Sequence, residues 1–184
     1  MAVDRGRATR ERLLDAGVAL VGELGWGGVS TRRVAERAGV RPGLVHYHFA
    51  SLEDLLVTAC VGAARPMLAG VLAMLREHRD LNAGLAALLT DLERYTGTTP
   101  AFLMLTEAFL AAARIPRLRT ELAGLLAEFR TGAAEWLNTL GHTDGAEAAA
   151  TVLAAAIDGL ILHRALDASI DLPPLATPLR RMLA

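Results

Sequence analysis

The chain has 184 residues, of which 53% are hydrophobic and 4% aromatic, and its formal net charge is −1. This length allows one domain, or one small module and a larger one, with ample apolar content for a core. The charge excludes binding to nucleic acid through bulk positive charge alone. A single cysteine, Cys60, excludes an internal disulfide and fits a reducing compartment.

Leucine and alanine are abundant, and no alternation typical of strands is found, so the composition predicts helices throughout. The N-terminus lacks the apolar core of a signal peptide. The most hydrophobic stretch, residues 148–162, is too short to span a bilayer and contains Asp158. It is interpreted as a buried interface helix. We therefore expect no transmembrane segment, and a cytoplasmic protein.

The first predicted helix covers residues 7–24 and presents one apolar face. Gly25-Trp26-Gly27-Gly28 ends it. Arg5, Arg7 and Arg10 are interpreted as an arm along a DNA backbone or as a disordered tail. Residues 1–51 hold eight arginines and five acidic residues, a net of about +3 against about −4 for the remainder.

Residues 30–49 are typical of two short helices joined by a tight turn. Ser30 is a good N-cap, and Gly39 follows the first helix where a positive φ is needed. Pro42 suits the first turn of the second helix, and Val45 and Phe49 can both face inward. This is the layout of a helix-turn-helix whose second helix enters a major groove.

A capping box at Ser51 and Asp54 starts a fourth helix, in which Pro66 is expected to cause a kink or break before a continuation to residue 78. Further helices are predicted at residues 81–95, 101–114 after a Thr99 cap, 116–140, 146–166 after a box formed by Asp144 and Glu147, and 179–183. The total is about nine or ten helices, and the fold class is all-α.

The run from Thr9 to Leu56 resembles the TetR family of bacterial transcriptional repressors. The matching motifs are Thr-Arg-Glu-Arg-Leu-Leu-Asp-Ala-Gly, Ser-Thr-Arg-Arg-Val-Ala-Glu-Arg-Ala-Gly-Val and Gly-Leu-Val-His-Tyr-His-Phe. Residues 100–119 and Asp158-Gly159-Leu160 look like the family's regulatory domain. Two positions depart from its pattern: a Tyr is usual where His46 stands, and a Lys is common where Leu52 stands.

The resemblance implies a DNA-binding domain at residues 1–50 and a ligand-binding and dimerisation domain at residues 51–184. It implies a homodimer, which we assign to the helices at about 116–140 and 146–166, bound to double-stranded operator DNA. It also implies a small-molecule effector in the helical core. Low aromatic content favours an apolar or amphipathic effector. The predicted function is a repressor released from its operator by that ligand.

Residues near the start of a recognition helix approach base edges, and Arg41 can donate twice to a guanine. Gly43 leaves room for the backbone, whereas His46 and Tyr47 suit phosphates. Free N–H groups of the preceding helix favour a phosphate beside Thr31 and Arg32. The predicted DNA contacts are Thr31, Arg32, Arg41, Pro42, Gly43, His46, Tyr47 and Ser51.

Polar residues within the later apolar helices are the candidates for ligand contact: Cys60, Arg94, Tyr95, Thr106, Glu107 and His163. Ordinary packing is the simpler reading of each. No phosphate loop, zinc spacing or Glu-x-x-His pair is present, so neither an enzyme, nor a cofactor, nor a metal is expected. Two alternatives stay open: a helical regulator without a small-molecule ligand, and a helical binding protein whose head no longer binds DNA.

Overall fold

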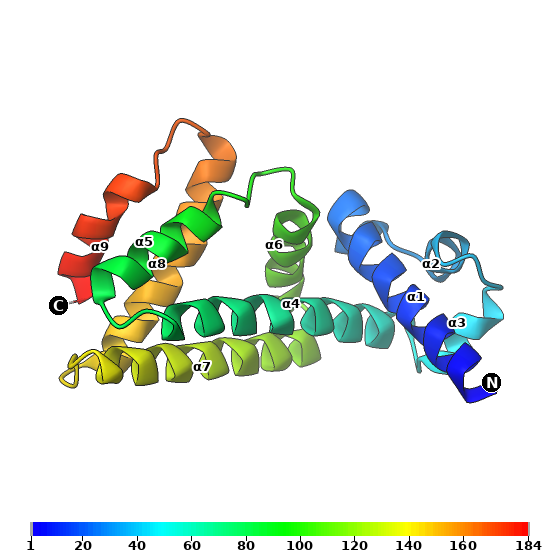
Figure 1. The fold of residues 1–184 in the computed structure, drawn as a ribbon. Coiled ribbons are helices and arrows are strands. Elements are labelled where there is room, and N and C mark those ends of the chain that lie inside the picture. The colour runs from blue at the N-terminus through cyan, green and yellow to red at the C-terminus, as the bar shows by residue number, and fades with distance from the viewer. Residues whose placement is uncertain (1, 184) are drawn as a thin grey trace. The chain divides into compact units, whose positions relative to one another are not determined.

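The computed structural model describes the backbone of residues 2–183 and the side chains of residues 5–183 (Figure 1). Over this range the chain forms nine α-helices and no strand, which confirms the all-α prediction. The helices are α1 (Ala2–Leu24), α2 (Thr31–Arg37), α3 (Gly43–His48), α4 (Leu52–Arg76), α5 (Leu81–Leu92), α6 (Pro100–Ala112), α7 (Pro116–Thr139), α8 (Ala146–Leu166) and α9 (Ala176–Leu183). Short 3-10 helices, η1 (Trp26–Gly28) and η2 (Pro173–Leu175), precede α2 and α9.

The chain divides into two compact units. The first contains residues 1–64 and 100–122, and the second contains residues 65–99 and 123–184. This division does not coincide with the functional division expected at residue 50. The difference arises because α4 continues without interruption past that point, and because α6 packs against α1.

The first unit is built around α1. Leu13 and Val21 on its inner face are fully buried, together with Val34 of α2 and Val45 of α3. Gly22 lets α6 cross closely, since a Cβ there would lie 3.3 Å from the backbone oxygen of Pro100. The helix-turn-helix and α6 therefore pack against the same helix.

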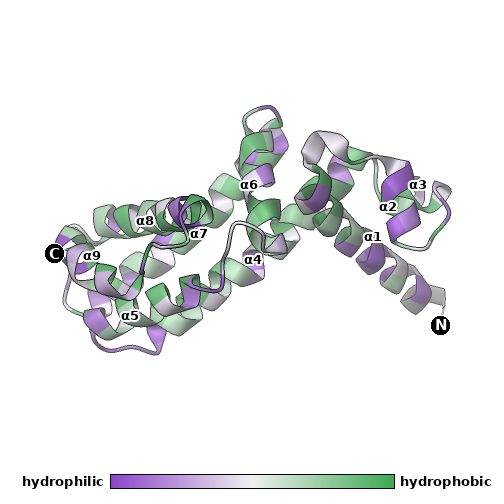
Figure 2. Cartoon of the chain, turned by 90° about the horizontal axis from the view of Figure 1, so that it is seen from above, coloured by the Kyte–Doolittle hydropathy of each residue, from purple (hydrophilic) through white to green (hydrophobic). Residues whose placement is uncertain are grey.

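The second unit has its own core of leucines from α5 and aromatic residues from α7. Phe129 and Trp136 are buried there, and the Trp136 Nε1 donates to the backbone oxygen of His78 at 3.1 Å. Gly84 of α5 lies directly against the Trp136 ring. Hydrophobic residues also predominate along α8 (Figure 2).

Two expectations need correction, one at the start of α1 and one within α4. Arg5, Arg7 and Arg10 lie within α1, which begins at Ala2, so they form neither an extended arm nor a disordered tail. Pro66 lies inside α4, so the break that was one of the two expected outcomes does not occur, and a kink there stays a prediction. Buried residues on both sides, such as Ala64 and Leu75, hold the helix, and this packing outweighs the hydrogen bond lost at Pro66.

Two predicted N-caps were also wrong. The Thr99 hydroxyl donates to the Thr96 carbonyl at 3.0 Å instead of accepting from α6. At α8 the N-cap is Gly145, with a φ of 74° and no side-chain cap. Because the left-handed glycine turns the chain at that point, Asp144 lies one residue too early to cap the helix.

Candidate nucleic-acid interface

Helix α2 and the turn after it have the conformation that their sequence predicts. The Ser30 Oγ accepts from the Arg33 N–H at 3.4 Å and caps α2. Gly39 adopts a φ of 65°, and the Val40 N–H donates to the Ala35 carbonyl at 2.9 Å to close the turn. These bonds fix where α3 begins.

Helix α3 presents one face to the core and the other to solvent. Val45 is fully buried and Phe49, at the C-cap, is 3% exposed. On the opposite face His46 is exposed and Tyr47 is 79% exposed, with its ring edge-on to His48 at 5.0 Å between centroids. The outer face is thus free to contact a major groove.

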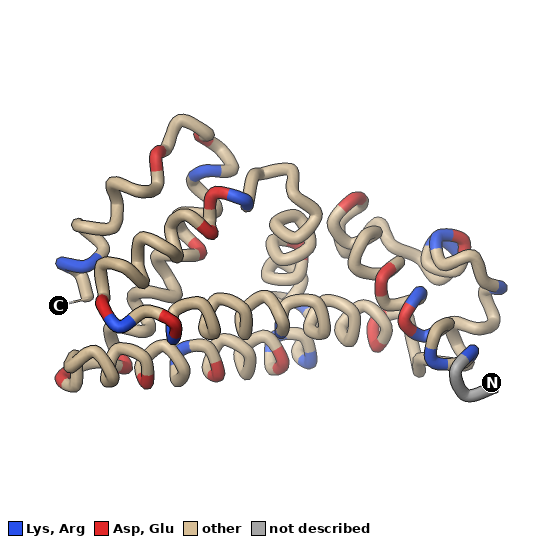
Figure 3. The backbone as a smooth tube through the Cα atoms, viewed as in Figure 1, with Lys and Arg blue, Asp and Glu red and all other residues tan. Residues whose placement is uncertain are grey.

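The arginines of the first unit are interspersed with acidic residues (Figure 3), and the structure separates those with partners from those without. Arg12 donates to the Ala38 carbonyl at 3.3 Å, and Arg33 donates to the Gly28 carbonyl. Within the described residues, no partner is recorded for the side chains of Arg32 and Arg41. Both are exposed, so their guanidinium groups are available to phosphates or bases.

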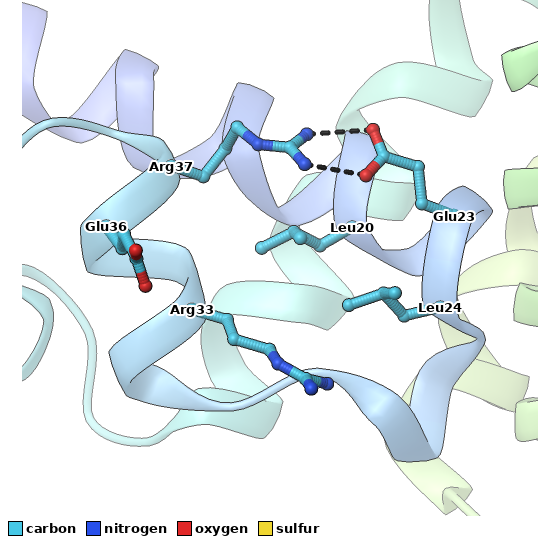
Figure 4. Close-up of a pocket in the computed structure, with 6 residues that line it drawn as sticks. All are labelled: Leu20, Glu23, Leu24, Arg33, Glu36 and Arg37. Carbon is cyan, nitrogen blue, oxygen red and sulfur yellow. Dashed lines mark hydrogen bonds and ion pairs between the residues drawn. The ribbon is translucent and has the colours of Figure 1, made fainter.

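A hollow on the first unit lies between α1 and α2 and is lined by Leu20, Glu23, Leu24, Arg33, Glu36 and Arg37 (Figure 4). Glu23 and Arg37 close it with a two-pronged ion pair of 2.8 and 2.6 Å. The hydrogen bonds from Arg37 hold the pKa of the Glu23 carboxyl below its usual value. This pair joins α1 to α2 and engages the Arg37 guanidinium, so Arg37 is not free to contact DNA.

The other predicted contact residues lie at the start of α3 or near it in the chain. Thr31 is half-buried as the first residue of α2, whereas Pro42, Gly43 and Ser51 are exposed. The Ser51 Oγ accepts from the Asp54 N–H at 3.0 Å and caps α4. The Asp54 carboxylate reaches back one residue further than expected, to the Ala50 N–H at 3.0 Å. Ser51 is thereby held at the start of α4.

The predicted ligand residues fall in both units. Cys60 is fully buried, which raises the pKa of its thiol to about 12, so it is an inert part of the core. Glu107 is half-buried and accepts from the Trp26 N–H at 3.0 Å, and Thr106 is half-buried beside it. Glu107 and Trp26 lie 81 residues apart in the sequence, so no local sequence pattern predicts this contact.

In the second unit, Arg94 and Tyr95 are brought together, with the guanidinium 5.0 Å from the ring centroid. Arg94 also pairs with Asp91 at 3.0 Å. His163 is exposed and lies apart from them in an apolar groove of about 370 Å³ between α8 and α9. The groove is lined by Ala156, Gly159, Leu160, His163, Ile170, Leu175, Pro178, Leu179 and Met182.

This fold and this surface define a helical DNA-binding regulator with a helix-turn-helix at its N-terminal end. A family model described as bacterial regulatory proteins, tetR family, matches residues 13–59. A second, described as tetracyclin repressor-like, C-terminal domain, matches residues 76–184. The chain belongs to the TetR family of bacterial regulatory proteins. Members of this family are transcriptional regulators and not enzymes, which confirms that prediction.

Individual relatives agree with the family assignment. The transcriptional regulator BetI of Rhizobium meliloti is 27% identical over 161 residues, which cover 87% of this chain and 79% of BetI. A TetR-family structure from Streptomyces coelicolor is 31% identical, with a TM-score of 0.76 and 96% and 98% of the two chains covered. The multidrug binding protein EbrR, complexed with imidazole, is 32% identical, with a TM-score of 0.71 and 95% and 89% covered.

Proposed function

We propose that this regulator is a repressor that binds a palindromic operator as a homodimer and is released by a small ligand. Residues 1–50 contact DNA, and residues 51–184 bind the effector and dimerise. The observation that carries DNA contact is the pair of exposed guanidinium groups without a protein partner among the described residues, Arg32 on α2 and Arg41 in the turn before α3. Recognition helices of the two copies then lie about 34–36 Å apart, one DNA turn.

The composition of the first unit supports a ligand that releases the protein from its operator, and not one that recruits the protein to DNA. The helix-turn-helix belongs to the same compact unit as α6 and residues 116–122 of α7. Helix α7 continues from this unit into the second unit, so an effector bound in the second unit can displace residues 116–122 through α7 and remove packing from the head. To convert a dimer from mostly bound to mostly free, it must favour the released form by about 5 kcal/mol.

The groove between α8 and α9 supports an apolar or amphipathic effector. Its lining is aliphatic except for His163, whose imidazole supplies one polar group. This combination of apolar wall and single polar anchor suits small amphiphiles. EbrR, a multidrug binding protein, shares the fold at 32% identity, which is consistent with this class of ligand.

The dimer interface is proposed to use the side of α8 that does not line the groove. Two large apolar side chains stay exposed there: Leu162 at 48% and Leu166 at 92%. The apolar face of α7 is already buried in the core of the second unit, and its exposed residues include Glu128 and Glu135. Of the two helices assigned to the interface from the sequence, the burial pattern therefore favours α8.

Helix α8, which carries the exposed apolar stripe of Leu162 and Leu166, also meets the length and hydropathy criterion for crossing a membrane, as does α4. We assign the stripe on α8 to a second copy of the chain, because TetR-family regulators act as dimers. This assignment keeps the protein in the cytoplasm with its DNA.

The oligomeric state tests the interface. Leu162→Glu and Leu166→Glu should shift the protein from dimer to monomer in sedimentation, whereas Ala123→Glu on the exposed side of α7 should leave the dimer intact. Dissociation by the α7 variant alone would place the interface on α7 and contradict the assignment to α8.

Operator binding is tested by fluorescence anisotropy against DNA from upstream of the protein's own gene, at several salt concentrations. A steep fall of affinity with salt supports specific contact with phosphates, and a slope near zero would favour a head that no longer binds DNA. Adding a series of alkyl amphiphiles should then release the DNA, and His163→Ala should weaken the response. Steady binding under all of them would favour a regulator without a small-molecule ligand.

A further inference from the structure

Two carboxylates hold the backbone at the two ends of the helix-turn-helix. Before α2, the Trp26 N–H donates to the Glu107 Oε2 at 3.0 Å. After α3, the Ala50 N–H donates to the Asp54 Oδ2 at 3.0 Å. Both N–H groups belong to turns, where a backbone donor has no partner within a helix. The segment that carries the recognition helix is therefore fixed at each end by a side chain outside it.

The contact between Trp26 and Glu107 depends on two glycines, one in α1 and one directly after it. Gly25 has a φ of 72°, and a Cβ there would lie 3.1 Å from the Glu107 Oε2. One turn earlier, Gly22 lets the backbone of Pro100 approach α1. Helix α6 thus lies close enough for Glu107 to accept from the N–H of Trp26, the first residue of η1. That N–H has no hydrogen-bond acceptor among its neighbours in the chain.

The contact after α3 is held from α7. The Arg117 Nη1 donates to the Asp54 Oδ1 at 2.6 Å, and the Arg117 Nε donates to Glu121 at 2.9 Å. The bond from Arg117, with that from Ala50, keeps the pKa of the Asp54 carboxyl below its usual value. Arg117 therefore orients a carboxylate whose other oxygen holds the turn after the recognition helix.

We propose that Glu107 and Arg117 are positioning residues for operator binding, acting through Trp26 and Asp54 to fix the orientation of the helix-turn-helix. Neither lies in α2 or α3, and Glu107, being anionic, is repelled by phosphate. The inference rests on the proposed binding of an operator by this head. It adds two residues, one on α6 and one on α7, through which the regulatory helices act on DNA affinity.

The sign of the Glu107→Ala effect separates positioning from electrostatics. Removing a negative charge near the head would by itself tighten DNA binding. Loss of positioning should instead weaken operator binding by about tenfold, because one hydrogen bond to a fixed backbone group is lost. Glu107→Gln keeps a carbonyl oxygen as an acceptor and should restore most of the affinity. Gly25→Ala crowds the carboxylate and strains the backbone at a φ of 72°, so it should weaken operator binding in the same direction as Glu107→Ala.

Arg117→Ala should also weaken binding by about tenfold without changing the dependence of log K on log salt, because no phosphate contact is removed. Glu128→Ala is the matched control. It breaks a pair with Arg65 of the same kind, at 2.6 Å, in the second unit, and should leave operator affinity unchanged. Amide exchange at Trp26 should quicken in Glu107→Ala and stay slow in Glu107→Gln.

Affinities are measured on the DNA-active fraction, found by stoichiometric titration, so partial unfolding does not count as weaker binding. Unchanged affinity of that fraction in Glu107→Ala and Arg117→Ala would overturn the inference. A salt slope that falls by about 1 in Arg117→Ala would also overturn it, by making Arg117 a phosphate contact. Failure of the wild-type protein to bind any upstream DNA would instead remove the proposed function, and with it the basis of the inference.

Discussion

The guanidinium carbon of Arg10 lies 4.9 Å from the centroid of the Phe49 ring. This places a cation of α1 over the residue that ends the recognition helix, and a guanidinium over an aromatic face is attracted by the ring quadrupole. Phe49 is 3% exposed, so Arg10 also covers the edge of the core. Arg10 therefore ties α1 to the end of α3.

Arg10→Gln should lower the free energy of unfolding by about 0.5–1 kcal/mol, the usual range for an exposed cation–π pair. Arg7→Gln serves as the control. Arg7 is exposed, and its ion pair with Glu11 is a surface pair with the long separation of 3.9 Å. Its effect should stay within about 0.5 kcal/mol. Urea unfolding followed by circular dichroism measures both. Equal losses in the two variants would show that the ring contact adds nothing to stability.

Arg32 and Arg33 are neighbours on α2 with different surroundings, and their alanine variants should differ accordingly. Arg32 has no recorded partner in the described structure, so Arg32→Ala should lower affinity evenly across operator sequences and reduce the salt slope by about 1. Arg33 donates to the Gly28 carbonyl, so Arg33→Ala should chiefly reduce stability. Anisotropy titrations at four salt concentrations separate them. A larger slope change for Arg33 would reverse the assignment.

Arg41 lies in the turn before α3, where its side chain is exposed. If it donates twice to a guanine, Arg41→Ala should cost about 1–3 kcal/mol of binding and relax the preference at one base pair. Binding to a set of operators with single substitutions tests this. A uniform loss across the set would make Arg41 a phosphate contact instead.

Sequence patterns predicted those parts of the head that are fixed by neighbours in the chain. Ser30, Gly39 and Val45 follow rules of capping, turn conformation and helical spacing that act over a few residues. The hydrogen bonds from the Trp26 N–H to Glu107 and from Arg117 to Asp54 join residues 81 and 63 positions apart. No local rule predicts these pairs, because the packing of α6 and α7 in the folded unit determines them.

The same limit applies to the arginines. Residue type and helical position do not separate Arg12, Arg33 and Arg37 from Arg32, since all are charged residues on short or amphipathic helices. Their partners are a carbonyl at the end of α2, a carbonyl in the α1–α2 turn and a glutamate on α1. Only the fold shows that these three guanidinium groups are engaged.

The Asp54 carboxyl makes the stability of the first unit depend on pH. Its pKa is lowered, first by the hydrogen bond from Arg117, so the native protein binds fewer protons there than the unfolded chain. The stabilisation is therefore present above about pH 4 and is lost as the pH falls through the lowered pKa. The stability gap between wild type and Asp54→Asn should be wider at pH 7 than at pH 3. A gap that widens on acidification would contradict this sign.

Gly84 and Gly70 are both helical glycines of the second unit, and alanine should affect them in opposite directions. A Cβ at Gly84 would overlap the buried ring of Trp136, whereas nothing lies within 4 Å of one at Gly70. Overpacking should make Gly84→Ala less stable by about 1–3 kcal/mol. Gly70→Ala should be more stable by about 0.5–1 kcal/mol, since alanine favours a helix interior. Urea midpoints at constant m-value measure both, with Trp136 fluorescence reporting the site. A Gly84→Ala protein as stable as the wild type would mean that the Trp136 ring can move, and that the core around it is not closely packed.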